Sequence, residues 1–196
     1  GSIADVVVTF AYPEQAGDGR RRISAFIVET GADSVEREEL PSKMGMFTAN
    51  TGMFEMTEHP VPLENMLGDE GNGFRVAMGT LVSGRLSVAA GCLGVIEDCL
   101  AEVIDYGRSR EQHAARIELG RGASEALIEK AALAKADSDA KSDDAELAQR
   151  ADILVAEAKY FASNAAWDAA DRAVQVFGGR GWSELYRVGR DLQDVR

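Results

Sequence analysis

The pattern of apolar and polar residues changes once along the chain and divides it into two parts. Up to about Gly68, short runs of β-branched and aromatic residues alternate with turn-forming segments, which is typical of strands. We expect strands at 4–11, 23–29 and 51–57, with a long hairpin connection between the first two. Loops and strand edges tolerate proline, and this part holds all four prolines, at 13, 41, 60 and 62.

From Gly71 onward the chain has no proline, and apolar residues recur every three or four positions, which indicates long helices. One stripe, interrupted by a single arginine, consists of Phe74, Met78, Leu81, Arg85, Ala89, Cys92, Ile96, Cys99, Val103 and Tyr106. A second stripe consists of Leu147, Ala151, Leu154, Ala158, Phe161, Ala165, Ala169, Ala173 and Val176. The pair Gly178–Gly179 follows it and predicts a helix end.

The residues between the two stripes, 118–144, are alanine-rich and charged, and they predict a weaker helix that ends in an acidic loop. Long helices joined by short connections are typical of an antiparallel bundle. The whole pattern therefore predicts an α+β chain in which a β part is followed by a helical bundle.

The charge of the chain limits its partners. A formal net charge of −12 argues against nucleic acid, whose phosphates require a basic surface. The 21 basic residues are mostly arginines, and an acidic surface with few lysines is expected of a protein that stays soluble in strong salt. A halophilic source and an ordinary acidic enzyme both fit this composition.

The sequence gives no strong signal for a membrane helix, export, a disulfide or a metal site. The chain has no apolar run of the roughly 18 residues that a membrane helix needs. Its first residues lack the pattern of a signal peptide, so we expect a cytoplasmic protein without a membrane partner.

Cys92 and Cys99 lie two turns apart on one predicted helix, which favours core thiols over a disulfide. His59 and His113 do not cluster with them, so we expect no metal site.

Four segments in the chain resemble, in the same order, the motifs of a flavoprotein family. They are 43–45 with 61–74 (KMG and VPLENMLGDEGNGF), 106–112 (YGRSREQ), 158–163 (AKYFAS) and 173–182 (AVQVFGGRGW). With them the chain resembles the acyl-CoA dehydrogenases over most of its length. The resemblance implies that 1–68 is part of the family's middle β domain. It also implies that 69–196 is its C-terminal up-down four-helix bundle, truncated at the end.

The resemblance implies an activity as well. In this family FAD accepts a hydride from the β carbon of an acyl-CoA thioester while a carboxylate removes the α proton. The implied partners are the acyl-CoA substrate, an electron-transfer flavoprotein and further copies of the chain in a homodimer or homotetramer. An acyl-CoA oxidase or a flavin monooxygenase on the same fold is an alternative. A non-catalytic oligomerisation or binding module is another.

The second motif assigns three residues to the cofactor. Arg110 matches the arginine that contacts the FAD pyrophosphate of a neighbouring subunit, a role that suits its planar guanidinium. Gln112 matches a polar position beside the same cofactor, and His113 stands where the family has phenylalanine. A surface arginine at a helix end and an exposed loop histidine are the alternatives for Arg110 and His113.

The fourth motif assigns three more cofactor residues. Gln175, Gly178 and Gly179 match a second segment that binds the pyrophosphate. Glycine lets a backbone approach a phosphate closely, because it has no Cβ. A glycine pair after a helix can also be a simple cap.

Two residues of the first stripe are candidates for the substrate. Arg85 lies among apolar residues, where an unpaired charge is costly, and it matches an arginine that helps to hold the CoA portion or the acyl pocket. Leu81, one turn earlier, would line the acyl pocket, or it is an ordinary core leucine. Val82 stands where many members carry an aspartate, which departs from the usual substrate site.

No catalytic residue is assigned within the chain. The resemblance places the catalytic glutamate in an EGT-like motif a few residues beyond Arg196. Some members carry it just before the helix arginine, and that position here is Gly84. We therefore expect the 196-residue chain by itself to be inactive.

Overall fold

The computed structural model of the chain describes residues 2–12, 22–106, 111–141 and 143–196, without the side chains of 111–113 and 115. The chain forms two compact units, Gly1–Leu81 and Val82–Arg196. Strands lie in the first unit and most of the helical residues in the second, so the α+β class is confirmed. The domain boundary that the sequence suggests at residue 68 stays a prediction.

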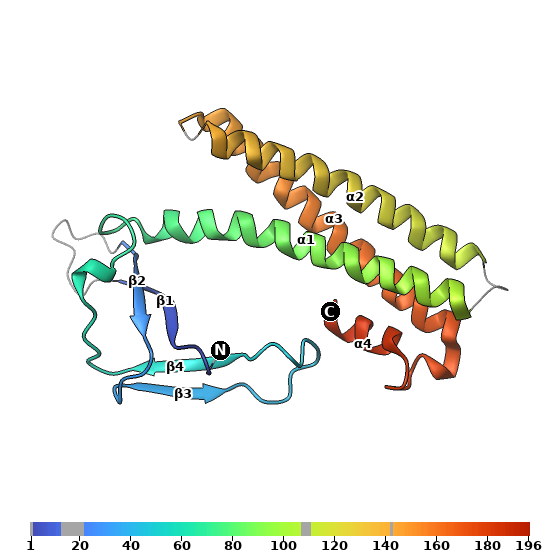
Figure 1. Ribbon diagram of the computed structural model, residues 1–196, viewed down its shortest axis with the longest axis horizontal. Helices are drawn as coiled ribbons and strands as arrows, with labels where there is room; N and C mark the ends of the chain where they lie inside the picture. Colours follow the sequence, from blue (N-terminus) through green and yellow to red (C-terminus); the bar gives the residue numbers. More distant parts are fainter. Residues whose placement is uncertain (1, 13–21, 107–110, 142) are drawn as a thin grey trace. The chain divides into compact units, whose positions relative to one another are not determined.

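The first unit contains two small antiparallel sheets (Figure 1). Strand β1 (Val6–Ala11) pairs with β2 (Ser24–Glu29), and β3 (Val35–Glu39) pairs with β4 (Gly52–Met56). Three of these strands lie where the sequence predicted them. The prediction missed β3, because four of its five residues are charged and only Val35 is buried.

The segment of the first motif follows β2 and fixes the start of the long helix. The short 3-10 helix η1 (Leu63–Asn65) places the Asn65 side chain so that it donates to the carbonyl of Ile27 at 3.1 Å. Further on, the amide of Gly73 donates to the carbonyl of Ile23 at 2.7 Å. A Cβ on Gly73 would lie 2.6 Å from the backbone of Ser24, so this contact requires glycine. The asparagine and the glycine thus have structural roles in the motif.

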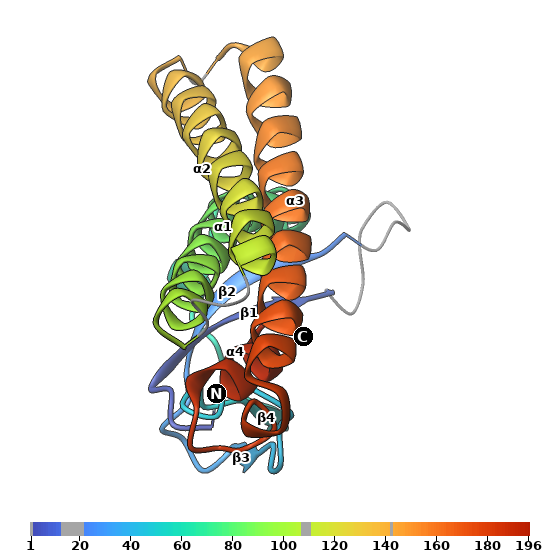
Figure 2. The same cartoon turned by 90° about the vertical axis from the view of Figure 1, so that its right-hand side faces the viewer.

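The helices are α1 (Gly73–Tyr106), α2 (Glu111–Ala140), α3 (Ala145–Phe177) and the short α4 (Arg187–Asp194), with a 3-10 turn η2 (Gly178–Arg180) after α3. Successive helices of the second unit run in alternating directions, as expected for an up-down bundle (Figures 1 and 2). Helix α2 starts earlier than the predicted 118. Asp144 caps α3, because its side chain accepts from the amides of Glu146 and Leu147.

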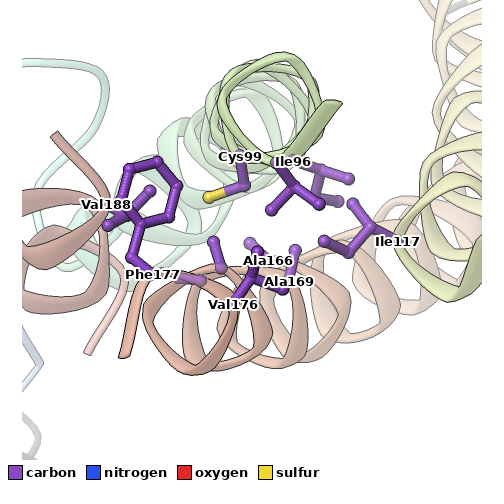
Figure 3. Packing of buried hydrophobic residues seen from close by; sticks show 11 residues of the cluster. Ile96, Cys99, Ile117, Ala166, Ala169, Val176, Phe177 and Val188 are labelled. Carbon is purple, nitrogen blue, oxygen red and sulfur yellow. The ribbon is translucent and has the colours of Figure 1, made fainter. Parts of the chain in front are cut away.

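The main core of the second unit joins all four helices (Figure 3). Its buried members are Ile96, Cys99, Val103, Ile117, Ala166, Ala169, Ala170, Ala173, Val176, Phe177 and Val188. Alanines dominate the contribution of α3 and allow the neighbouring helices to approach it closely. Each large aliphatic side chain buried here contributes about 1.5–3 kcal/mol to the stability of the fold. A smaller cluster consists of Val82, Ala131, Leu154, Val155 and Ala158.

The apolar stripe of α1 is buried over only part of its length. Ile96, Cys99 and Val103 are buried, whereas Phe74 is 65% exposed and Leu81 is 45% exposed. The period of the stripe predicted the helix correctly. Leu81 does not behave as a core leucine within the described residues. In the part of the chain that the structure describes, no helix is long and apolar enough to cross a membrane.

Candidate functional site

Three aromatic rings join the ends of the helices on which the second and fourth motifs depend. The ring of Tyr106, the last residue of α1, stacks on that of Phe177, the last residue of α3, with 4.0 Å between centroids and 14° between planes. Tyr186, which directly precedes α4, meets Phe177 edge-on at 5.4 Å and Tyr106 at 6.4 Å. The last residues of α1 and α3 therefore lie side by side in the bundle.

The backbone after α3 is open to solvent. Gly178 has φ 59° and ψ −134°, and its amide donates to the carbonyls of Val174 and Gln175, so it caps the helix. Both Gly178 and Gly179 are exposed, and a Cβ built on either would meet no atom within 4 Å. The helix end that the sequence predicted is confirmed. The open space above the two glycines leaves their backbone accessible to a bound group.

Gly181 differs from these two glycines. It is buried, and a Cβ at this position would lie 2.7 Å from the carbonyl oxygen of Val174 and 3.1 Å from Cβ of Phe177. The fourth motif therefore contains one glycine that packing requires and two that packing leaves free. Packing leaves Gly178 and Gly179 free, although the positive φ of Gly178 at the helix cap still favours glycine there.

Arg180 is a cation beside the open glycines, and the sequence-based site did not include it. Its guanidinium lies 5.9 Å from the centroid of the Tyr106 ring, and Nη1 donates to the Tyr106 hydroxyl at 3.4 Å. The contact with Tyr106 holds an exposed arginine over the end of α1. A cation directly after a glycine pair is the sequence signal that could have found it.

The structure places only part of the predicted cofactor set. Gln175 is exposed on the last turn of α3, next to the two glycines. Arg110 lies outside the described residues, as do the side chains of Gln112 and His113, whose backbone is in the first turn of α2. Because Tyr106 stacks on Phe177, α1 ends close to the helix end that the glycine pair follows.

The predicted substrate residues both lie on α1, one turn apart. Arg85 is half-buried and makes no hydrogen bond or ion pair with any described residue. Val82 is buried and belongs to the apolar cluster with Leu154 and Val155. An aspartate at position 82 would place a carboxylate in this cluster, so the valine suits the packing of this bundle.

A separate cavity lies in the first unit. It has a volume of about 600 Å³ and is lined by β2, the turn after it and the segment 59–65. The Ser34 hydroxyl lies 2.8 Å from Nδ1 of His59 at its edge. None of the predicted cofactor or substrate residues that the structure describes lines this cavity, and we do not include it in the candidate site.

Comparison with known proteins agrees with these features. The family model for the acyl-CoA dehydrogenase C-terminal domain matches residues 71–196. The whole chain is 34% identical to the short-chain specific acyl-CoA dehydrogenase of Megasphaera elsdenii and 38% identical to an acyl-CoA dehydrogenase of Bacillus subtilis, and covers 52% of each. The solved butyryl-CoA dehydrogenase of Megasphaera elsdenii matches 100% of this chain with 51% of its own, at 33% identity and a TM-score of 0.86. The chain thus spans about half the length of these relatives.

Proposed function

The chain belongs to the acyl-CoA dehydrogenase family, and we propose that the protein of which it is part catalyses FAD-dependent α,β-dehydrogenation of an acyl-CoA thioester. The single observation that carries this proposal is the junction at the end of the bundle. There the stacking of Tyr106 on Phe177 places the end of α1 against the end of α3, which an exposed glycine pair follows. An accessible backbone with a neighbouring cation suits a phosphate group.

In this proposal the junction binds the pyrophosphate of FAD. Gly178 and Gly179 offer a backbone that a phosphate can approach closely, and Gln175 and Arg180 flank it. The proposal adds Arg110, Gln112 and His113, which the second motif assigns to the same cofactor. When bound, FAD would accept the hydride from the substrate. The contacts serve the FAD of a neighbouring subunit, so a homodimer or homotetramer is part of the proposal.

The substrate side rests on α1. Arg85 is a half-buried cation without a partner among the described residues, and it is available to an anionic portion of CoA or to the thioester carbonyl. Leu81 presents an exposed apolar side chain one turn earlier, as a wall of an acyl pocket requires.

The general base that removes the α proton is the glutamate expected beyond Arg196. An electron-transfer flavoprotein is the proposed acceptor, and the cytoplasm the proposed location.

The test uses the full-length protein, purified with its flavin. Acyl-CoAs with four to sixteen carbons are added without oxygen, and the flavin absorbance is followed. We expect at least one of them to bleach the flavin, and an artificial dye to restore its colour. Air is then admitted to the reduced protein. Rapid production of hydrogen peroxide would favour an oxidase, and a protein without flavin would favour a non-catalytic module.

A further inference from the structure

Helix α4 is attached to α1 through a cluster of acidic groups that the proposed function does not use. Asp191, on α4, is only 8% exposed, and its Oδ2 accepts from the Cys99 thiol, with 3.9 Å between oxygen and sulfur. Asp98 precedes Cys99 on α1, and Arg187 Nη2 on α4 lies 2.9 Å from Asp98 Oδ2. The same face of α4 buries Val188 completely.

The carboxylates of Asp98 and Asp191 would repel each other, and the single cation Arg187 cannot neutralise both. Arg187 is largely exposed and forms the ion pair with Asp98. Asp98 Oδ2 is buried and has no hydrogen-bond donor of good geometry among the described residues. A proton on Asp191 provides such a donor, because Asp98 is its side-chain hydrogen-bond partner.

The surroundings determine which group titrates. Burial, followed by the charge of Asp98 and the hydrogen bond to it, raises the pKa of Asp191 to about 6, and Asp194 raises this pKa further while Arg187 lowers it. Burial and nearby carboxylates, Asp191 foremost and then Asp98 and Glu102, raise the pKa of Cys99 to about 12, so its thiol remains protonated. Helix α3 contributes Ala169, Ala173 and Phe177 to the apolar cluster that includes Val188. Asp191 is therefore the group of this contact that titrates near neutral pH.

We propose that Asp191, packed against Asp98, is a pH-sensitive clamp, which holds α4 on α1 while its carboxyl group is protonated and loosens when that proton is lost. Tyr186 directly precedes α4 and packs against Phe177 and Tyr106. Loosening α4 therefore also releases the segment 178–186, which contains the open glycines. The clamp links the protonation of a buried carboxyl to the order of this end of the bundle.

The direction of the pH effect follows from linkage. Asp191 binds its proton more tightly in the closed contact than in an open chain, where an aspartate has a pKa of about 3.9. The contact is thus strongest below about pH 4, weakens as the pH rises toward 6, and stays weak above that value. From these two pKa values, the opening equilibrium of α4 increases about tenfold between pH 5 and pH 7.5.

Hydrogen exchange of the α4 amides in the full-length protein tests this proposal. After correction for intrinsic exchange rates, we expect protection of α4 to fall about tenfold from pH 5 to pH 7.5, while protection of α3 stays constant. Asp191→Asn cannot lose a proton and should abolish the pH dependence. Glu97→Gln, which changes an exposed acid beside Asp98, is the matched control and should leave it intact.

Two further variants separate a titrating clamp from ordinary packing. Asp98→Asn removes the charge that raises the pKa of Asp191, so the midpoint should move to lower pH. Arg187→Gln removes the charge that lowers this pKa, so the midpoint should move to higher pH. Exchange of α4 that does not depend on pH would overturn the proposal. It would also fail if the dependence survived in Asp191→Asn, or if both charge variants moved the midpoint in the same direction.

Discussion

Tyr106 and Phe177 lie 4.0 Å apart, centroid to centroid, and their stacked rings join the last residue of α1 to the last residue of α3. They belong to two motifs that are far apart in sequence. The two motifs do not by themselves predict that they lie close together. The packing of the bundle brings the ends of the two helices into contact. The aromatic contact thus holds together the ends of the two helices that carry these motifs.

Phe177→Ala should destabilise the second unit by about 3–5 kcal/mol, because Phe177 is a buried core residue and the substitution leaves a cavity. Denaturant unfolding followed by circular dichroism measures the change. Tyr160→Ala is the control, since Tyr160 is an aromatic residue on the same helix but is 72% exposed. It should change stability by less than about 0.5 kcal/mol. Equal effects of the two substitutions would contradict the packing role of Phe177.

Arg110→Ala in the full-length protein should lose about 2–4 kcal/mol of FAD affinity, because the charge-assisted contact with the pyrophosphate disappears. Arg108→Ala changes an arginine two residues earlier that the motif does not assign to the cofactor, and it should lose little. The FAD content of each variant after gel filtration measures the effect. Comparable retention of FAD by both variants would remove Arg110 from the site.

The stability of the protein should increase with salt. The chain has a net charge of −12, and its β3–β4 pair places Glu36 directly opposite Glu55. Like charges at paired positions repel, and ions in the solvent screen that repulsion. We expect a higher melting temperature in molar potassium chloride than in dilute buffer. A midpoint that is equal or lower in salt would rule out a salt requirement.

The sequence predicted what depends on local pattern. The turn at Gly178, the period of α1 and the strands around residues 6–11 and 24–29 follow from the residues at those positions. Strand β3 has no apolar alternation, and its position comes from pairing with β4. The spacing of apolar residues along α1 also does not determine which of them are buried, because their burial depends on the side chains that the other helices supply.

The acidic clamp could not be predicted either. Asp98 and Asp191 each read as ordinary charged helix residues, and only the docking of α4 on α1 buries Asp191 beside Asp98. For the candidate site, the motifs supplied Gln175, Gly178 and Gly179. Arg180 required the structure, because its relation to Tyr106 is a contact between two helix ends.

Gly179→Ala and Gly181→Ala distinguish a cofactor-binding glycine from a packing glycine. At Gly179 the added methyl group meets no atom within 4 Å, so the melting temperature without flavin should not fall. If FAD approaches this backbone closely, the same methyl group should lower FAD affinity, by roughly 1–3 kcal/mol for an overpacked contact. At Gly181 the methyl group would lie 2.7 Å from the carbonyl oxygen of Val174, so this variant should lose stability even without flavin. Melting curves of the flavin-free protein and FAD titrations of both variants make the comparison. Unchanged FAD affinity in Gly179→Ala would remove that glycine from the cofactor site.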